Sequence, residues 1–361
     1  MNKTVPQMSL AIMKTDFIIV GQGLAGTILG FELQKAGKSV FYIDAPRFQK
    51  SSDVAAGIIN PVVFKRLTQS WLIDELFPQL EDTYHEVSLL LNQQFYFPAS
   101  IRKILGEQEI KLWQKKASSP LLSSYLQADI DFNQLPDFHF PYGTGWVRHG
   151  GWLNLKQLIL SYHNYLKNKG TLLETTFEYH QLHIFDDHVT YRDLKAQKII
   201  FCEGHRNTVN PYFSSIRYKL TKGEILTLRL PDLGFDYILN KNGFLMAMGN
   251  HHFRLGATYD WKQTDELPTP EGQQQLLDKL QKMTSKTGNI IEHMAGIRPT
   301  THDRRPVIGL HPDHPQLGIF NGLGSKGCML APYFACQFKE LLIGNKNALH
   351  PEVRLNRYYK V

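Results

Sequence analysis

The stretch TDFIIVGQGLAGTILGFELQKAGKSVFYIDA, residues 15–45, decides the fold of the N-terminal part of the chain. An apolar run at 17–20 ends at a glycine, apolar residues recur at helical spacing over 27–36, and a second apolar run at 40–43 ends at Asp44. Such patterns predict a buried parallel strand, a helix and a second parallel strand. The segment is therefore predicted to form a β–α–β unit.

The turn between the first strand and the helix carries the pattern Gly21-x-Gly23-x-x-Gly26. The first glycine permits a tight turn, the second lets the backbone approach a pyrophosphate, and the third lets helix and strand pack closely. The helix N-terminus adds free N–H groups and a positive dipole end. Asp44 is placed to accept hydrogen bonds from a ribose hydroxyl. A dinucleotide site is therefore predicted, with these residues: Gly21, Gly23, Leu24, Ala25, Gly26, Asp44 and Ala45.

The composition is that of a globular protein, with 42% hydrophobic and 20% charged residues among 361. This length predicts two domains or one large one. No apolar run reaches the ~18 residues that a membrane span requires. The formal net charge of +7 favours anionic partners, from a flavin pyrophosphate to RNA, but the positive residues are scattered along the sequence.

The cysteines and histidines predict neither a disulfide framework nor a metal site. Cys202, Cys328 and Cys336 have no paired or metal-ligand spacing. His251 and His252 are adjacent on a predicted strand, so they would point to opposite faces. Residues 1–13 lack a signal-peptide core and a cleavage site, and we expect them to form a disordered extension of a cytoplasmic protein.

The glycine pattern alone does not distinguish FAD from NAD. An NAD dehydrogenase would normally continue with further β–α units, whereas this chain continues with a Ser/Gly/Ala-containing loop over 51–66. The C-terminal part carries two more notable segments, AGIRPTTHDRRPVIG at 295–309 and FNGLGSKGCMLAPYFA at 320–335. The glycine-rich turn in the second of them precedes a predicted helix at Met329, so its N–H groups form a second anion-friendly cradle.

Together with KSSDVAAGIINP (50–61), FCEGH (201–205) and KGE (222–224), these segments resemble the D-amino-acid oxidase-like family of FAD-dependent oxidoreductases in order and spacing. That family includes glycine oxidase, sarcosine oxidase and the oxidase half of a bifunctional tRNA-modifying enzyme. The resemblance covers nearly the whole chain. It implies that the β–α–β unit holds the ADP half of FAD and that the last strands return beside it, which brings the glycine-rich turn to the flavin.

The resemblance also implies which other residues approach the cofactor. Small residues at 51–58 would lie against the flat ring, a strand at Phe177 would touch FAD through its backbone, and Arg298 would lie beside the ring. These further cofactor-binding residues are Ser51, Ser52, Ala56, Gly57, Ile58, Phe177, Glu203, Gly204, Arg298, Gly322, Gly324, Ser325, Lys326, Gly327, Cys328 and Met329. The cysteine that binds FAD covalently in sarcosine oxidases has no counterpart near RPTTHD, so non-covalent FAD is expected.

The predicted substrate site centres on Arg298, which follows Gly296-Ile297 and precedes Pro299. In amino-acid oxidases of the family, the matching arginine clamps the substrate carboxylate, a role that suits a planar guanidinium. An ion pair with a nearby acid such as Asp303 is the alternative. Lys326 would supply positive charge near the flavin. Arg254 replaces a lysine of the sarcosine oxidases, which argues against their mode of oxygen activation, and Tyr259 is a substrate-facing or a core tyrosine.

The fold class that follows is α/β, α+β overall. A glutathione-reductase-type FAD-binding Rossmann domain is predicted to interleave with a substrate domain built on an antiparallel or mixed sheet. The FAD-binding domain is assigned to 14–92, 147–211 and 291–361, and the substrate or cap domain to 93–146 and 212–290.

The predicted function is oxidation of a carboxylate-bearing primary or secondary amine by hydride transfer to FAD. A stand-alone oxidase of carboxymethylaminomethyl-uridine in tRNA is the second reading, because GLGSKG, GATYD and GWLNLKQL most resemble the tRNA-modifying oxidase half. Against it, the chain has no methyltransferase domain and no basic tail. A flavin-binding protein without turnover is a third reading. A 2-hydroxy-acid dehydrogenase of the same superfamily is a fourth, although its expected histidine is absent from 51–66.

Overall fold

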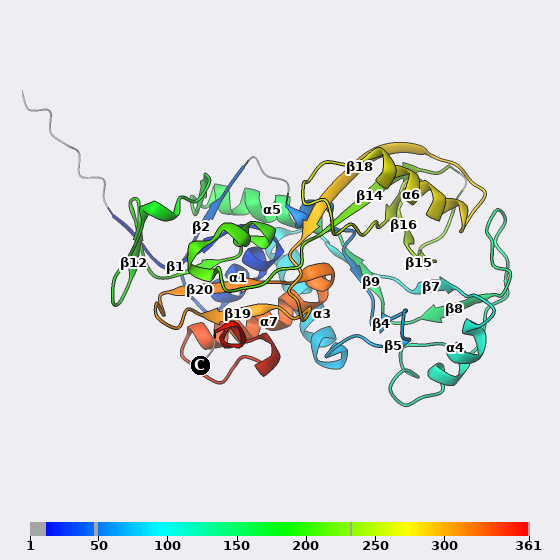
Figure 1. The fold of residues 1–361 in the computed structure, drawn as a ribbon, viewed down its shortest axis with the longest axis horizontal. Helices are drawn as coiled ribbons and strands as arrows, with labels where there is room; N and C mark the ends of the chain where they lie inside the picture. Colours follow the sequence, from blue (N-terminus) through cyan, green and yellow to red (C-terminus); the bar gives the residue numbers. More distant parts are fainter. Residues whose placement is uncertain (1–11, 47–49, 232, 360–361) are drawn as a thin grey trace, which may run out of the picture.

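The computed structural model describes residues 12–46, 50–231 and 233–359. Two large sheets lie side by side along the molecule (Figure 1). The first strand, the helix that follows it and the C-terminal helices belong to one sheet. The middle of the chain forms the other. The mixed α/β class expected from the sequence is confirmed. No helix among the described residues has the length and apolar character needed to cross a bilayer.

The first sheet has eight strands, and its main path runs β10-β2-β1-β13-β12-β11, with β20 paired to β13 and β19 to β20. Its strands in chain order are β1 (Met13–Val20), β2 (Val40–Asp44), β10 (Leu172–Glu174), β11 (Leu182–Ile184), β12 (Val189–Tyr191), β13 (Leu194–Phe201), β19 (Val307–Leu310) and β20 (Leu317–Asn321). β10, β2, β1, β13 and β20 are mutually parallel, so their carboxyl ends meet at one edge of the sheet. This edge is where a ligand site is expected in an open α/β sheet.

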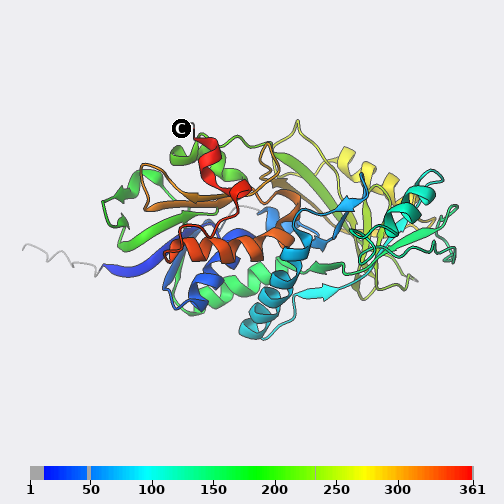
Figure 2. The ribbon, with the colours of Figure 1, turned by 90° about the horizontal axis from the view of Figure 1, so that it is seen from below.

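Helices cover one face of this sheet, and α3, α5 and α7 lie next to one another in Figure 2. The helices of the chain are α1 (Leu24–Lys35), α2 (Ser51–Val54), α3 (Ile73–Leu91), α4 (Glu109–Ala117), α5 (Leu155–Asn168), α6 (Pro270–Gln281) and α7 (Gly327–Leu342). Side chains of β1 alternate between the two faces: Phe17 and Ile19 join the core under the helices, whereas Ile18 and Val20 join a second core on the opposite face. This period of two is what the apolar strand pattern predicts.

The second sheet has seven strands in the order β18-β14-β17-β16-β15-β7-β8, mostly antiparallel. Its strands are β7 (Ile101–Ile104), β8 (Thr144–Val147), β14 (Thr221–Arg229), β15 (Ile238–Asn240), β16 (Phe244–Gly249), β17 (His252–Gly256) and β18 (Asn289–Arg298). Leu276 and Leu280 of α6 pack on one face with apolar residues of β14, β15, β16 and β17. The opposite face of the sheet is turned toward the first sheet.

Two small sheets connect these parts. One has the order β3-β9-β6 and the other pairs β4 with β5. Their strands are β3 (Ile58–Ile59), β4 (Val62–Val63), β5 (Thr68–Gln69), β6 (Tyr96–Pro98) and β9 (Gly151–Leu153). β3 follows directly on the Ser/Ala/Gly segment and holds it beside α5 through its pairing with β9.

Several details differ from the sequence-based expectation. β1 begins at Met13, which pairs with Leu194, so the predicted extension over 1–13 is wrong at its last residue, and residues 1–11 lie outside the described residues. Residues 291–298, assigned to the FAD-binding part, instead form most of β18 in the second sheet. The helix α4 was not predicted because only Trp113 and Ala117 of its residues are buried, too few to form a visible apolar stripe.

Candidate functional site

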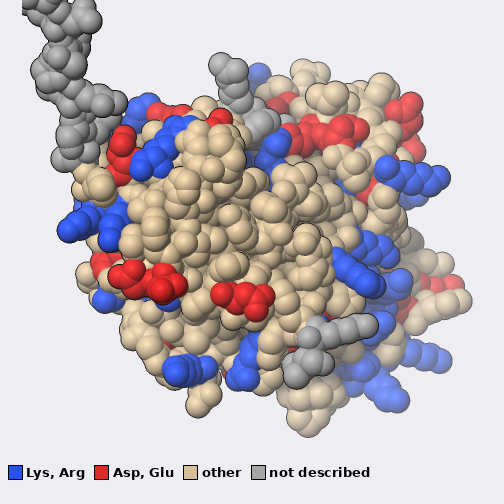
Figure 3. Space-filling model, turned by 60° about the vertical axis from the view of Figure 1, so that its left-hand side comes forward, with Lys and Arg blue, Asp and Glu red and all other residues tan. Residues whose placement is uncertain are grey.

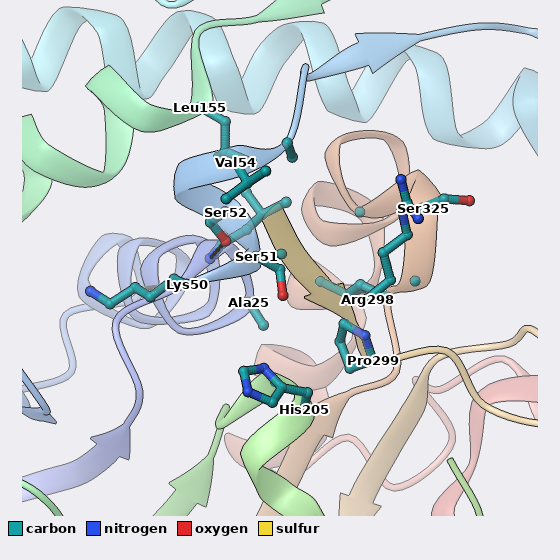
Figure 4. Close-up of a pocket in the computed structure, with 18 of the residues that line it drawn as sticks. Ala25, Lys50, Ser51, Ser52, Val54, Leu155, His205, Arg298, Pro299 and Ser325 are labelled. Carbon is teal, nitrogen blue, oxygen red and sulfur yellow. Dashed lines mark hydrogen bonds between the residues drawn. The ribbon is translucent and has the colours of Figure 1, made fainter. Parts of the chain in front are cut away.

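A cavity of about 550 Å³ lies between the two large sheets. Its walls are the carboxyl ends of β1, β2 and β13, the start of α1, the segment containing α2, and the free face of the second sheet. Figure 4 shows Ala25, Ser51, Ser52 and Arg298 from these separate elements converging on it. Segments almost three hundred residues apart in the sequence therefore share one site.

One end of the cavity is the start of α1. Gly23 is its N-cap, and the helix has neither a side-chain cap nor an acidic residue in its first turn. Gly21 has φ +96°, and a Cβ there would lie 2.5 Å from the carbonyl oxygen of Cys202. A Cβ on Gly23 would meet only the Ser52 hydroxyl, at 3.4 Å, so the space above this backbone is open. An uncapped helix N-terminus beneath an open backbone is suited to a phosphate group.

Gly26 does not line the cavity, unlike Gly21, Gly23, Leu24 and Ala25. A Cβ at Gly26 would lie 2.0 Å from the carbonyl oxygen of Gly21, so this glycine allows α1 to pack on the turn after β1. Gly26 was predicted in the dinucleotide motif because it lets helix and strand pack closely, and this geometry is consistent with that role.

Asp44 and Ala45 line the cavity beside the glycine turn. The Asp44 carboxylate is 6% exposed, accepts a hydrogen bond from the backbone N–H of Gln22 at 2.8 Å, and lies 2.6 Å from the ammonium nitrogen of Lys50. Lys50 was not predicted, because no sequence pattern indicates that its side chain turns back to the end of β2. A carboxylate held in this way keeps acceptor capacity for a ribose hydroxyl.

The segment 51–58 lines the middle of the cavity with Ser51, Ser52, Ala56, Gly57 and Ile58, all of them predicted. The Ser52 hydroxyl accepts a hydrogen bond from the Leu24 N–H at 3.0 Å, which ties the segment to α1. Gly57 has φ +77°, and a Cβ there would lie 1.9 Å from the carbonyl oxygen of Leu153. Only glycine fits this crossing, which sets the segment close to β9.

Phe177, Glu203 and Gly204 also line the cavity. Phe177 follows β10 in a loop and stacks on Tyr191, so its predicted strand conformation is wrong because β10 ends at Glu174. The Glu203 carboxylate accepts hydrogen bonds from the Tyr179 hydroxyl and from the side-chain amides of two asparagines, Asn207 and Asn210. Burial raises the pKa of Glu203. Because protein groups donate all of these hydrogen bonds, the Glu203 carboxylate stabilises the cavity wall.

The glycine-rich turn closes the cavity with residues 324–329. Gly322 does not line the cavity, because its backbone turns toward Thr301, whose side chain would lie 2.8 Å from a Cβ at position 322. The Lys326 ammonium donates to the Ser70 hydroxyl at 2.9 Å. Burial, and secondarily the charge of Arg305, lower the pKa of Lys326 to about 8.

Lys326→Met should stabilise the cofactor-free protein at pH 7. The pKa of Lys326 is about 8 in the folded protein, against 10.5 for an ordinary lysine. The folded state therefore binds this proton more weakly than the unfolded state. The resulting destabilisation is complete below pH 8, decreases between pH 8 and 10.5, and is absent above pH 10.5. The variant should raise the free energy of unfolding by about 1–3 kcal/mol at pH 7. Urea unfolding at pH 7 and at pH 10.5 measures this, and the difference should vanish at the higher pH. A destabilised variant at pH 7 would contradict it.

Arg298 stands at the end of β18, and two residues later Thr300 pairs with Leu323, which begins the glycine-rich turn. The Arg298 guanidinium lies 4.4 Å from the centre of the Tyr259 ring and over Gly223, where a Cβ would come within 2.0 Å. Its hydrogen bonds, all of 3.4 Å, go to the backbone carbonyls of Lys222 and Thr258. Burial lowers the pKa of Arg298.

No carboxylate among the described residues forms an ion pair with Arg298. The alternative partner, Asp303, pairs instead with Arg357 at 2.9 Å. A half-buried guanidinium with only long bonds to carbonyls, facing a cavity, is able to receive an external carboxylate in a bidentate manner.

Tyr259 lines the cavity, and 55% of its surface is exposed, so it is not a core tyrosine. Arg254 does not line the cavity. It is buried beneath the segment 51–58 and donates a hydrogen bond to the carbonyl of Ala55 at 3.2 Å, so the structure places it behind the wall. Its predicted catalytic position is therefore wrong, since the chain between α2 and β3 covers it.

Residues 258–268 form a strap that runs past Arg298. Lys222, 1% exposed, holds the strap by donating to Asp265 at 2.8 Å and Gln263 at 3.0 Å. Farther along, a buried oxygen of Glu266 lies 3.0 Å from His205 Nε2 without a hydrogen bond. Burial lowers the pKa of His205 to about 4 and raises that of Glu266. The Lys222 side chain thus anchors the middle of the strap, while backbone hydrogen bonds between Lys222 and Asp260 and between Thr258 and Glu224 hold its beginning.

Lys222→Met should loosen the strap without unfolding the protein. Methionine fills a similar volume but offers no donor to Asp265, whose side chain is 53% exposed and stays hydrated. Amide exchange over 258–268 should accelerate by ~10-fold or more, with α7 unchanged. Hydrogen–deuterium exchange measures both, and equal rates in the two proteins over 258–268 would show that Lys222 does not anchor the strap.

Sequence reasoning missed several other cavity residues besides Lys50. They come from β4, β7, β15, β16 and the crossover after β13, and they are Val62, Val63, Ile101, His205, Ile238, Asn240 and Phe244. Ile101 pairs with β15, which is distant in sequence, whereas Ile238, Asn240 and Phe244 belong to the local β15–β16 hairpin. No sequence pattern shows which face of these strands lines a cavity. Among the described residues, no three His, Cys, Asp or Glu side chains gather closely enough to hold a metal ion.

The family model for FAD-dependent oxidoreductases, named DAO, matches residues 16–340. The chain belongs to this family. The DAO family match confirms the resemblance stated from the sequence, and the glycine turn, the uncapped α1 and the cradle at 324–327 fit its FAD cofactor.

Curated DAO relatives include glycine oxidase of Pseudomonas putida, 22% identical over 94% of this chain and 97% of that protein. The tRNA 5-methylaminomethyl-2-thiouridine biosynthesis bifunctional protein MnmC of Marinobacter nauticus is 32% identical over 40% of this chain and 25% of its own length. Among solved structures, glycine oxidase from Geobacillus kaustophilus has a TM-score of 0.80 at 17% identity, covering 95% of this chain and 99% of that chain. The matches to MnmC proteins span from 24% to 47% of their length.

Proposed function

We propose that this DAO-family protein binds FAD non-covalently and oxidises a primary or secondary amine that carries a carboxylate. The observation that carries the proposal is Arg298, whose guanidinium lines the cavity and has no carboxylate partner among the described residues. A half-buried cation that faces a cavity and has no anionic partner can be stabilised by an anion that a ligand supplies. A substrate carboxylate is the anion that fits the planar fork of this side chain.

The cofactor would lie along the cavity, with each part of FAD beside a different part of the cavity wall. Gly21–Ala25 would hold the pyrophosphate, Asp44 the ribose, and segments 51–58 and 324–327 the ring system. Non-covalent binding is supported by the two cysteines on the wall, since burial raises the pKa of Cys202 and raises that of Cys328 to about 12. A thiol, unlike a thiolate, is a poor nucleophile for attachment.

In this reaction the protein mainly has to bind the substrate and orient it relative to the cofactor. FAD, when bound, supplies the hydride acceptor. Arg298 would fix the carboxylate, the exposed ring of Tyr259 would shield that contact from water, and the strap would keep both in place. Lys326, with its pKa near 8, would place a titratable positive charge at the glycine-rich turn. Orientation of the reacting carbon is the larger contribution in such a reaction.

A second candidate is oxidation of a carboxymethylaminomethyl group on tRNA. It is favoured by the 32% identity to MnmC over 161 residues, and this substrate also joins a secondary amine to a carboxylate. On the face shown in Figure 3 the centre is uncharged, basic and acidic side chains mix along the left and upper edges, and lysine and arginine side chains gather toward the right-hand edge. The small amine is the first candidate because the relatives that match nearly the whole chain include glycine oxidase.

The test is anaerobic reduction of the purified yellow protein. Amino acids, N-substituted glycines and tRNA carrying the modified uridine are added separately, and loss of the ~450 nm flavin band identifies a substrate. Bleaching by a carboxylate-bearing amine, but not by its amide, supports the proposal. Bleaching only by modified tRNA favours the second candidate. Bleaching by a 2-hydroxy acid alone would overturn both, and no bleaching by any compound would favour a flavin protein without turnover.

A further inference from the structure

The free face of the second sheet forms one long wall of the cavity. We call it the cavity floor and define it by Gly223 and Ile225 of β14, Phe244 of β16, Ile238 and Asn240 of β15, and Ile101 of β7. The strand register shows that these residues share one face: Ile225 pairs with Gly256, Gly256 with Phe244, Phe244 with Asn240, and Ile238 with Ile101. Directly paired residues project to the same side of a sheet.

The floor is much longer than a small amino acid. Arg298 stands on β18, and Asn240 stands on β15, four strands away in the order β18-β14-β17-β16-β15. Strands are spaced by about 4.8 Å, so the two residues are on strands roughly 19 Å apart. Only one carbon separates the carboxylate from the amine in an α-amino acid. A glycine held by Arg298 would not reach Phe244 and Asn240, the partly exposed residues of the far end of the floor.

The floor is apolar at its far end except for Asn240; on the facing wall Asn60 also lines the cavity, and its side-chain oxygen accepts a hydrogen bond from the Val62 N–H at 2.9 Å. Ile101 and Ile238 are each 1% exposed, the Phe244 ring lies over Gly256, and Val62 and Val63 of β4 complete the cavity lining. Asn240 also lines the cavity, and within the described residues its side-chain amide makes no hydrogen bond. An apolar floor with one amide suits a ligand group that is mostly apolar and has a polar edge.

We infer that the substrate carries a large apolar group, aromatic rather than small, whose far edge forms a hydrogen bond with Asn240. This inference rests on the proposed function, since Arg298 fixes the carboxylate from which the group extends. Substituents on the α-carbon or on the nitrogen would both run along the floor over Phe244. The preferred substrates are aryl-bearing amino acids or N-arylalkyl glycines, in place of glycine or N-methylglycine.

The inference is tested by binding, which needs no turnover. Acetate, 3-phenylpropionate and 3-(4-hydroxyphenyl)propionate are titrated into the FAD-loaded protein, and Kd is read from the change in flavin absorbance and from thermal stabilisation. Phenylpropionate should bind at least ~30-fold more tightly than acetate, because the ring buries apolar surface. The hydroxyl should tighten binding by a further ~5-fold through Asn240. Equal Kd values for acetate and phenylpropionate would overturn the inference.

Variants locate the effect on the floor. Phe244→Ala should remove most of the affinity that the phenyl group adds. Asn240→Ala should remove only the affinity that the hydroxyl adds. Phe132→Ala, at a phenylalanine that is 62% exposed and outside the cavity, is the matched control and should change neither. If Phe244→Ala fails to fold, Phe244→Leu keeps the packing and still loses the ring. A full phenyl gain in the folded variant would contradict the assignment.

Amides separate this inference from the proposed function. 3-Phenylpropanamide has the ring but no carboxylate, so its Kd relative to acetamide reports the floor alone. If the carboxylate role of Arg298 fails, acids and amides will bind equally while the gain from the phenyl group persists. If the floor is not a substrate site, acids will bind more tightly than amides, with no gain from the phenyl group in either series.

Discussion

Arg298→Leu should lower kcat/KM for a carboxylate-bearing amine by about 100-fold to 1,000-fold. Removing one partner of a desolvated, hydrogen-bonded ion pair commonly costs about 2–5 kcal/mol, which is roughly a 30-fold to 5,000-fold loss, and the expected loss lies in the middle of this range. The effect should fall mainly on KM, because the carboxylate contact exists before and during hydride transfer. Steady-state kinetics with the substrate found by anaerobic reduction measures it, and the flavin spectrum confirms that the variant still holds FAD.

Two variants sharpen the interpretation of Arg298. Arg298→Lys keeps the charge but loses the planar fork, so its kcat/KM should lie between those of the parent and Arg298→Leu. Arg148→Leu removes one positive charge from an exposed position outside the cavity, and it should be indistinguishable from the parent. A loss of less than about fivefold in Arg298→Leu would rule out the carboxylate clamp.

Gly23→Ala should abolish FAD binding while leaving the fold intact. The backbone at Gly23 has φ −86° and ψ −165°, which alanine adopts, and the added Cβ would meet only the Ser52 hydroxyl at 3.4 Å. That Cβ would occupy the space through which a pyrophosphate approaches the backbone. We expect the Kd for FAD to rise by at least ~100-fold and the Tm of the cofactor-free protein to change by less than ~3 °C. Fluorescence titration and thermal unfolding give the two numbers.

Neighbouring glycines provide the contrast that makes Gly23→Ala informative. Gly26→Ala should unfold or severely destabilise the protein, since its Cβ would lie 2.0 Å from the Gly21 carbonyl oxygen. Gly234→Ala should have no effect on either measurement, because nothing lies within 4 Å of a Cβ there. If Gly23→Ala binds FAD as the parent does, the phosphate end of the cavity has been assigned to the wrong residues.

The sequence predicted those parts of the site that depend on local backbone chemistry. The glycine turn after β1, the start of α1 and the small residues at 51–58 each follow from positions where a side chain would clash or a helix would begin. Arg298 was predicted from its motif, but only the structure shows that Asp303 pairs with Arg357 and forms no ion pair with Arg298. Constraints between residues that are close in sequence can therefore be recognised from the sequence alone.

The parts that could not be predicted depend on pairings between distant strands. Asn240 and Phe244 pair with each other in a local hairpin, but they reach the cavity because β15 also joins the distant β7 and this face of the sheet lines the cavity, which no local pattern specifies. Arg254 shows the converse, since its strand was predicted but the covering segment at Ala55 was not. Lys50 approaches Asp44 through a long flexible side chain, whose direction is set by its surroundings alone.

The return of the C-terminal part to the first sheet has a consequence for biosynthesis. β1 and β2 are made first, yet β20 joins β13 in the same sheet, and the glycine-rich turn after β20 completes the cavity wall. A nascent chain therefore carries an incomplete cofactor cradle until residue 329 has left the ribosome. Contacts of such long sequence separation form slowly and leave apolar surface uncovered meanwhile. We expect newly made chains to depend on chaperones until residues 324–329 have emerged and to capture flavin only after that point.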